Sequence, residues 1–308
     1  MMTISICIDE GYIMPATVLL TSIGMNGGDQ PKTIYVVSEK ELSEGSQKIL
    51  YDVCHKYDMT ILFKTFCLKT VWKTKNVEFQ RSDWSMALYL RLFLANTLPE
   101  RVEKTIYLDG DTIVRRSLEP LWNIDISDYA IAGVRDANQF SKNVVGTSEY
   151  DIHKYEYVNA GVMLMNLRYI RENNIVNRFI DYIVEKDFVL PLHDQQIVNN
   201  ILFDKKLLLP TKFNAQYHNY IKPKFRITPI EENNISEMLR DPVIVHYTWH
   251  IKPWLKYCRH PLAKEFTRIK EKTIYKNEKL KDSPTIRLRD KIAYLLYVIH
   301  LNYKLRNL

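Results

Sequence analysis

The sequence has few cysteines and no long hydrophobic run, and each absence excludes a class of protein. The four cysteines among 308 residues have no close-pair spacing, so the pattern predicts reduced thiols and neither a zinc cluster nor a disulfide framework. No stretch of eighteen or more apolar residues occurs, which argues against a transmembrane helix. Asp9 and Glu10 interrupt the apolar N-terminal residues and no basic segment precedes them, so no secretory signal is expected. We therefore expect a cytoplasmic protein.

Internal repeats and low-complexity segments are also missing, and the charge is distributed unevenly. A hydrophobic content of 46% and a charged content of 26% are typical of a globular protein with a substantial core. Residues 256–308 contain fourteen Lys and Arg against five Asp and Glu, which leaves −2 of the chain's net +7 for residues 1–255. We therefore predict a folded body at 1–255 and a basic, aromatic extension at 256–308. Because the body has no basic excess, no nucleic-acid partner is expected.

Two carboxylates follow a predicted strand in the middle of the chain. Residues 106–108 form an apolar run, and Asp109, Gly110 and Asp111 come directly after it. If the backbone stays extended, both carboxylates point to the same side, and Gly110 lets a ligand approach the backbone. Such a pair favours a hard divalent cation, which in turn binds phosphates. A surface turn would contain the same residue types, so the pattern alone leaves both interpretations open.

Strands and helices alternate along the first 66 residues. This order predicts parallel strands with helices packed on the faces of the sheet. Ligands bind such sheets at the carboxyl ends of the strands, so Asp9 and Asp109, which each follow a strand, are expected at one edge. The predicted strands are 4–8, 33–38, 59–66, 106–108, 130–134, 157–165 and 242–247, and the predicted helices include 43–57, 85–94 and a single long helix over 167–186.

Four further segments each allow two interpretations. Arg91 is either a surface arginine or a cation held over a carboxylate or phosphate. The small residues in 159–161 indicate either close approach of a ligand or backbone, or tight packing. Asp194 can cap a helix that carries Gln195 in its first turn. His246, at the end of a strand, is either a metal ligand or a hydrogen-bonded core residue.

Taken together, these segments resemble the retaining glycosyltransferases of family 8, most closely the bacterial lipopolysaccharide glucosyl- and galactosyltransferases. The resemblance runs from Ile4 to about Trp254 and depends on the order and spacing of short motifs. It implies an α/β fold, the single-domain nucleotide-sugar transferase (GT-A type) fold with a mixed, mostly parallel central sheet flanked by helices, here followed by a C-terminal helical extension. The matching motifs are Asp9 with Tyr12, Ala87-Leu88-Tyr89-Leu90-Arg91, Leu108-Asp109-Gly110-Asp111, Leu121-Trp122, Asn159-Ala160-Gly161, Asp194-Gln195, His246-Tyr247 and Lys252-Pro253-Trp254.

The resemblance implies that Asp109, Asp111 and His246 hold Mn²⁺, with Mg²⁺ as the alternative, at the two phosphates of a UDP-sugar. An imidazole beside two carboxylates suits Mn²⁺, and a dication stabilises the charge that builds on departing UDP. Uracil and ribose would lie near the first strand, and a lysine would neutralise the diphosphate. By the same resemblance the catalytic residues are Gln195, Asp194 and Asp136, and the substrate-binding residues are Cys7, Asp9, Tyr12, Arg91, Asn159, Gly161 and Lys252.

The family retains the configuration at the anomeric carbon, and the resemblance places Gln195 on the face opposite UDP. An uncharged amide is a poor nucleophile, so we expect a same-face reaction through an oxocarbenium-like ion pair. Asp194 and the Gln195 carbonyl would steady the cation, and the departing phosphate would take the acceptor proton. Two positions depart from the family pattern. Gly11 replaces a common Asn, and Trp249 replaces a glycine that approaches the diphosphate.

The basic extension contains a predicted amphipathic helix. Its apolar core is too short to span a membrane and suits a helix at the surface of an anionic leaflet, which predicts peripheral attachment to the inner face of the cell membrane and a saccharide or glycolipid acceptor. A helix docked on the body or on a partner is the alternative. The apolar face comprises Leu288, Ile292, Leu295, Leu296, Ile299 and Tyr303, and the basic residues at its ends are Arg287, Arg289, Lys291, Lys304 and Arg306.

Two other functions are compatible with part of the pattern. The segment 109–112 resembles the nucleophile loop of aspartyl-phosphate phosphohydrolases, but no Gly-Asp-x-x-x-Asp element follows Asp111. A non-catalytic sugar-binding protein of the same fold is the second alternative. The presence of both aspartates, His246 and Lys252 argues for a working enzyme.

Overall fold

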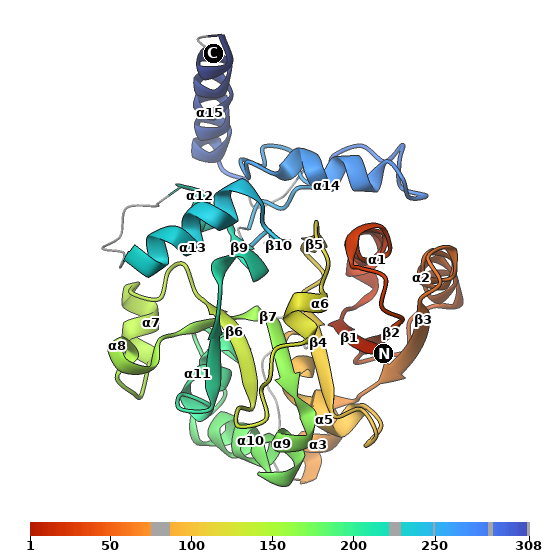
Figure 1. The fold of residues 1–308 in the computed structure, drawn as a ribbon, viewed down its shortest axis with the longest axis vertical. Coiled ribbons are helices and arrows are strands. Elements are labelled where there is room, and N and C mark those ends of the chain that lie inside the picture. The colour runs from red at the N-terminus through yellow and green to blue at the C-terminus, as the bar shows by residue number, and fades with distance from the viewer. Residues whose placement is uncertain (75–86, 222–228, 249, 283–285, 307–308) are drawn as a thin grey trace. The chain divides into compact units, whose positions relative to one another are not determined.

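The computed structural model describes residues 1–74, 87–221, 229–248, 250–282 and 286–306. The chain forms two compact units, Met1–His246 and Tyr247–Leu308. The predicted boundary at residue 255, between a catalytic body and a basic extension, stays a prediction. Figure 1 shows the central sheet of the first unit with helices around it.

A seven-stranded sheet forms the centre of the first unit, in the order β3-β2-β1-β4-β7-β6-β8. Strand β1 pairs in parallel with β2 and β4, and β2 pairs in parallel with β3. Strand β7 is antiparallel to both β4 and β6, and β8 is parallel to β6. The predicted mixed, mostly parallel sheet is therefore confirmed. Its strands are β1 (Met2–Cys7), β2 (Lys32–Ser38), β3 (Thr60–Thr65), β4 (Lys104–Leu108), β6 (Ile131–Arg135), β7 (Val158–Asn166) and β8 (Lys206–Leu209).

A second, three-stranded sheet brings distant parts of the chain together, in the order β5-β10-β9. Strand β10 is antiparallel to β5 and parallel to β9. This small sheet continues from the end of β4, because only residues 109–111 separate β4 from β5. Its strands are β5 (Thr112–Val114), β9 (Ala215–Gln216) and β10 (Ile244–His246).

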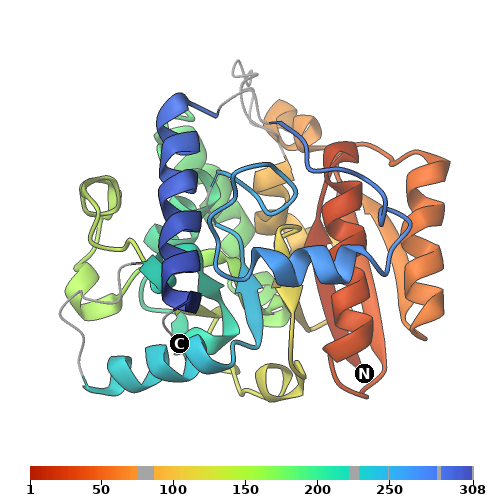
Figure 2. The same ribbon diagram turned by 90° about the horizontal axis from the view of Figure 1, so that it is seen from above.

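The central strands are apolar on both faces because helices cover both. Tyr35 and Val37 of β2 belong to the large core that includes α9–α11, and the intervening Ile34 and Val36 are also buried, pointing to the other face. Helices α1 and α2 lie side by side next to β1–β3 in both views (Figures 1 and 2). The early helices are α1 (Ile13–Asn26), which follows the 3-10 turn η1 (Glu10–Tyr12), α2 (Glu44–Lys56) and α3 (Leu68–Thr74).

The predicted long helix over 167–186 is wrong in one respect. The structure has two helices there, α9 (Leu167–Glu172) and α10 (Ile175–Glu185), because Asn174 adopts a left-handed φ of 53°. Asparagine tolerates this conformation better than most residues. Asn166 caps the first of these helices, since its side chain accepts a hydrogen bond from Tyr169 N.

The predicted helix over 85–94 is also interrupted, and its first two residues lie outside the described part of the chain. It consists of α4 (Ala87–Leu90), the 3-10 turn η2 (Arg91–Phe93) and α5 (Leu94–Thr97). The remaining helices of the first unit are α6 (Glu119–Trp122), α7 (Lys142–Thr147), α8 (Ile152–Tyr155), α11 (His193–Ile201), η3 (Thr211–Phe213), α12 (Tyr217–Ile221) and α13 (Pro229–Arg240).

The second unit contains α14 (Ala263–Lys270) and α15 (Leu288–Arg306). The helix predicted in the basic extension is therefore present. Within the described residues, no helix combines the length and the apolar character needed to cross a bilayer.

Candidate functional site

The two carboxylates in the middle of the chain lie on a turn, so the predicted extended backbone past Leu108 is wrong. Strand β4 ends at Leu108, and both the main-chain N and Oγ1 of Thr112 donate to Asp109 O, at 3.2 and 2.7 Å. The turn redirects the chain from the large sheet into β5. It is not a surface turn, because Asp111 is only 7% exposed.

Gly110 packs against Tyr12 on its Cβ side, and the approach of a ligand to its backbone stays a prediction. A Cβ atom at this position would lie 2.9 Å from Cδ1 of Tyr12, so the tyrosine ring fills the space beside the glycine. Burial raises the pKa of the Tyr12 hydroxyl, and the nearby carboxylates of Asp111, Asp109 and Asp9 act in the same direction.

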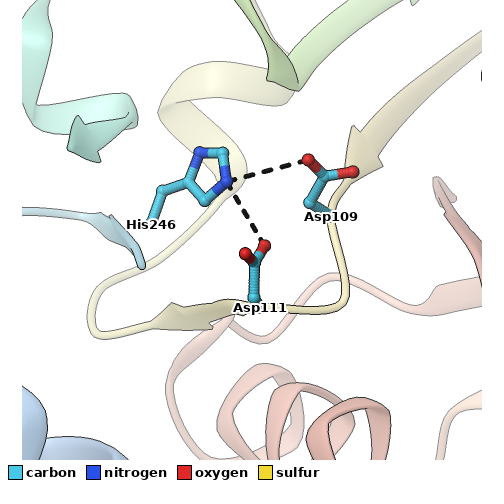
Figure 3. Close-up of side chains that lie close together, drawn as sticks. All are labelled: Asp109, Asp111 and His246. Carbon is cyan, nitrogen blue, oxygen red and sulfur yellow. Dashed lines mark ion pairs between the residues drawn. The ribbon is translucent and has the colours of Figure 1, made fainter. Parts of the chain in front are cut away.

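His246 meets both carboxylates because of how β5 and β10 pair. Their antiparallel register places His246 opposite Thr112, the residue after Asp111. Its Nε2 lies 3.3 Å from Asp111 Oδ1 and 3.7 Å from Asp109 Oδ2 (Figure 3). One ligand atom from each of the three residues lies within 4.8 Å of the others. The three predicted metal ligands therefore lie close together. His246 is buried, but its Nε2 still faces both carboxylates.

The chemistry of this donor set fits a divalent cation. Two carboxylates that face one imidazole nitrogen repel each other unless a positive charge lies among them. One nitrogen and carboxylate oxygens suit Mn²⁺, and the oxygens also suit Mg²⁺. Asp109, Asp111 and His246 are the residues that would hold such an ion.

Arg91 is buried beside these carboxylates, so the interpretation as a surface arginine is wrong. Its guanidinium lies 2.8 Å from Asp109 Oδ1 and 3.1 Å from Asp194 Oδ2, and it donates to Ala160 O at 2.9 Å. It also lies over the ring of Tyr107, whose hydroxyl donates to Asp109 Oδ1 at 2.6 Å. A buried guanidinium requires such partners. Arg91 thus contacts both oxygens of Asp109, Oδ1 at 2.8 Å and Oδ2 at 3.4 Å, and Oδ2 is also the oxygen that faces His246.

Asp194 pairs with Arg91 and does not cap its helix. The N-cap residue of α11 is Leu192, which makes no side-chain cap, and Asp194 lies in the first turn. Burial raises the pKa of Asp194 to about 6, while the charge of Arg91 acts in the opposite direction. Arg91 and main-chain hydrogen bonds therefore favour the ionised form of Asp194 against the effect of burial.

Gln195 belongs to a compact polar cluster with Asp136 and Asn159. Its Oε1 accepts hydrogen bonds from Asn159 Nδ2 at 3.0 Å and from Ala160 N at 3.2 Å, and its Nε2 donates to Asp136 Oδ2 at 3.1 Å. A carbonyl oxygen has two lone pairs, and both are used here. This arrangement leaves the Gln195 amide without a free lone pair for nucleophilic attack.

Gly161 is required by the packing of the metal-ligand candidates. A Cβ atom there would collide with Cε1 of His246 and lie 2.6 Å from Asp109 Oδ2. Its main-chain oxygen accepts a hydrogen bond from Asp109 N at 2.8 Å. The side chains closest to Gly161 are therefore those of metal-ligand candidates, and the approach of a ligand to residues 159–161 stays a prediction.

The residues predicted to bind the nucleotide lie at the end of β1, where Cys7 is the last residue of the strand and Asp9 follows it. Strand β1 is the parallel neighbour of β4, so Asp9 lies at the same edge of the sheet as Asp109, as predicted, and Cys7 lies beside it. Asp9 Oδ1 accepts a hydrogen bond from Gly11 N at 2.9 Å and caps η1. Cys7 is largely buried, which raises the pKa of its thiol.

Two predicted residues lie after His246, in the second unit. Lys252 Nζ donates to Tyr247 O at 2.7 Å, and its contact with a diphosphate stays a prediction. Trp249 lies outside the described residues.

Sequence reasoning missed Tyr107, described above, and Asn214, which both contact metal-ligand candidates. Asn214 is fully buried, and its Oδ1 lies 3.0 Å from His246 Nδ1. Its place before the two-residue strand β9 gives no periodic signal, so only the pairing of β9 with β10 reveals the contact.

Comparison with known proteins agrees with the geometry. A model of the family "Glycosyl transferase family 8" matches residues 3–258. "General stress protein A" of Bacillus subtilis is 27% identical over 268 residues, 84% of this chain and 90% of that protein. The lipopolysaccharide 1,2-glucosyltransferase of Escherichia coli K12 is 23% identical over 283 residues, 91% of this chain and 80% of that protein.

The fold comparison gives the same result. The crystal structure of the galactosyltransferase LgtC in complex with donor and acceptor sugar analogues superposes with a TM-score of 0.76 at 23% identity, covering 89% of this chain and 96% of that one. The predicted GT-A type fold is therefore confirmed.

Proposed function

Because the chain belongs to glycosyl transferase family 8, we propose that it transfers a hexose from a UDP-sugar to a saccharide acceptor with a divalent cation as cofactor. Membership of the family makes it a glycosyltransferase. The observation that supports the metal-dependent reaction is the convergence of Asp109, Asp111 and His246. The transferred hexose would be glucose or galactose, as in the names of similar proteins.

The proposed cofactor is Mn²⁺, with Mg²⁺ as the alternative. When bound, the ion would offset the negative charge that develops on the departing diphosphate. Asp109, Asp111 and His246 would hold it, and Arg91 would keep the Asp109 carboxylate in place through the 2.8 Å ion pair.

We assign the predicted contacts to the donor as proposals. Cys7 and Asp9 would contact uracil and ribose near η1, with Tyr12 beside them, and Lys252 would neutralise the diphosphate. The residues that would surround the donor sugar are Arg91, Asp136, Asn159, Gly161, Asp194 and Gln195.

The proposed reaction retains the anomeric configuration on one face of the sugar. Both lone pairs of the Gln195 amide oxygen accept hydrogen bonds. This supports the same-face route over a double displacement, because the oxygen would have to lose one of these hydrogen bonds to attack the anomeric carbon. The Asp194 carboxylate would steady the oxocarbenium-like ion electrostatically, and the departing phosphate would accept the proton of the acceptor hydroxyl.

We expect the purified protein to release UDP slowly from UDP-glucose or UDP-galactose with Mn²⁺, and faster when a hexose-terminated oligosaccharide is added. EDTA should reduce the release to background, because the charge on the leaving group then lacks its counterion. UDP release is measured by a coupled assay, product configuration by proton NMR, and protein mass by mass spectrometry.

Each alternative gives a distinct result in the same experiment. Hydrolysis of p-nitrophenyl phosphate without UDP release would indicate a phosphohydrolase. Donor binding without release would indicate a sugar-binding protein. An inverted product, or a sugar covalently attached to the protein, would contradict the same-face reaction.

We further propose an acceptor in lipopolysaccharide or another surface glycan, reached at the cytoplasmic face of the cell membrane. The names of similar proteins support the acceptor class. The apolar face of α15 supports membrane contact, because five of its large apolar side chains are 51–73% exposed and exposed basic residues lie near the N-terminal end of the helix. An anionic lipid surface matches both properties. The five side chains are Leu288, Ile292, Leu295, Leu296 and Ile299.

Replacing both Leu295 and Leu296 with aspartate is expected to weaken binding to vesicles of 30% phosphatidylglycerol in phosphatidylcholine by at least about tenfold, because two leucines no longer enter the interface. Cosedimentation measures the binding. The control is Ile274→Asp, which changes an apolar residue of the same unit that is 68% exposed but lies outside α15. Equal binding of all three proteins, or no binding by the unchanged protein, would contradict membrane contact through α15.

A further inference from the structure

A row of buried amides connects the His246 ring to Gln195. Asn214 is the first member, with its Oδ1 3.0 Å from His246 Nδ1 and its Nδ2 donating to Asn159 Oδ1 at 2.9 Å. Asn159 then donates to Gln195 Oε1 at 3.0 Å and to Asp136 Oδ2 at 3.1 Å. The row therefore joins the metal-ligand candidates to the cluster that contains Gln195.

Two main-chain N–H groups fix the direction of the hydrogen bonds in this row. Gly161 N donates to Asn159 at 3.1 Å, and Ala160 N donates to Gln195 at 3.2 Å. Because a main-chain N–H only donates, the side-chain atoms that face these groups must be oxygens. The other amide atom of Asn159 is therefore Nδ2, which agrees with its position beside the Asp136 carboxylate.

The orientation of the Asn159 amide also determines the orientation of Asn214 and the tautomer of His246. Since the Asn159 atom that faces Asn214 is an oxygen, Asn214 must present its NH₂ group to it. The remaining Asn214 oxygen then faces His246 Nδ1, so Nδ1 carries the proton. In a neutral imidazole the second nitrogen, Nε2, keeps its lone pair, and this is the nitrogen 3.3 Å from Asp111 Oδ1.

We propose that Asn214 is a positioning residue that holds His246 in the Nδ1–H tautomer and so directs the Nε2 lone pair at the metal site. The inference rests on the proposed metal centre. Flipping the Asn214 amide would bring two oxygens together at Asn159 and two potential donors together at His246, so the surroundings permit one orientation. Hydrogen-bond partners of metal-bound histidines raise metal affinity by about 10–100-fold.

Two substitutions separate the contacts of Asn214. Asn214→Leu has similar volume and removes both hydrogen bonds, so we expect Mn²⁺ binding to weaken by about 10–100-fold. Asn214→Asp keeps an acceptor for His246 but places an oxygen against Asn159 Oδ1. We expect it to bind Mn²⁺ at least as tightly as the unchanged protein while kcat falls.

Free Mn²⁺ is measured by electron paramagnetic resonance on the nucleotide-free protein, and thermal unfolding verifies folding. Asn166→Leu is the matched control, because Asn166 is also a buried asparagine, only 8% exposed, but lies at the far end of β7, where it caps α9. It should leave Mn²⁺ affinity unchanged. If both leucine variants lower the affinity equally, the proposal fails.

Nitrogen-15 NMR of the metal-free protein tests the tautomer directly, with the His246 signal assigned by its loss in His246→Gln. We expect a protonated Nδ1 in the unchanged protein and a shift of the proton toward Nε2 in Asn214→Leu. A protonated Nε2 in the unchanged protein would overturn the proposal. If the tautomer is as expected but no Mn²⁺ binds, the proposed metal centre fails while the role of Asn214 toward His246 is supported.

Discussion

Replacing Gly161 with alanine is expected to abolish Mn²⁺ binding and to lower the transfer rate by about 10³-fold. The new methyl group would occupy the position of the His246 ring and crowd Asp109 Oδ2, which lies 2.6 Å from the added carbon. His246 has little room to move, because it is buried and Asn214 holds its other nitrogen. Electron paramagnetic resonance of free Mn²⁺ and UDP release measure the two effects.

The substitution also adds volume to a packed strand, which destabilises the fold by about 1–3 kcal/mol. Gly133→Ala separates this general effect from the loss of the metal site. Gly133 lies on the neighbouring strand β6, where an added Cβ would approach Val158 at 3.3 Å and no metal-ligand candidate. We expect this control to bind Mn²⁺ normally. Normal metal binding by Gly161→Ala would contradict the arrangement of the site.

Asp111→Asn is expected to lower the transfer rate by about 10³-fold and to weaken Mn²⁺ binding by at least about 100-fold. The asparagine keeps the shape of the side chain but removes one negative charge from the proposed ion. Asp109 is already paired with Arg91, so Asp111 contributes a large part of the negative charge that faces the proposed ion. UDP release and electron paramagnetic resonance provide the measurements.

The same substitution should not destabilise the protein. Without a cation, Asp111 and Asp109 repel each other, so removing one charge relieves that repulsion. Thermal unfolding with EDTA is therefore expected at the same or a higher temperature than in the unchanged protein. Asp241→Asn is the control, since Asp241 is a partly exposed carboxylate 2.8 Å from Arg116 and should not affect transfer. Equal activity of both variants would exclude Asp111 from the metal centre.

The positions of Arg91 and Asp194 indicate how the protein keeps several charges in a buried site. One guanidinium contacts the carboxylates of Asp109 and Asp194, and burial alone would favour the protonated form of Asp194. A buried ion pair is costly to separate, because the remaining charge loses its partner. Arg91 therefore offsets part of the negative charge of the site, and its removal would leave two carboxylates without this partner.

Local patterns predicted the strands more accurately than the helices. The apolar runs that became β1, β2 and β4 are recognisable because a strand buried on both faces needs consecutive apolar residues. The break at Asn174 was missed because apolar residues continue on both sides of it, whereas the left-handed backbone there depends on one residue. The pattern left the Asp109–Thr112 turn as one of two interpretations, because Asp and Gly occur both in turns and at strand ends.

The sequence by itself determined the α/β class, the edge of the sheet where Asp9 and Asp109 lie, and the residue types of a divalent-cation site. These properties follow from the spacing of apolar residues and from the chemistry of carboxylate and imidazole groups. Only the tertiary structure decided that His246 faces the two aspartates, that Arg91 is buried between carboxylates, and that Asn214 holds the imidazole. The physical reason is that these contacts arise from pairing between β5, β9 and β10 and from helix packing, and residues far apart in the chain leave no periodic trace of such pairing.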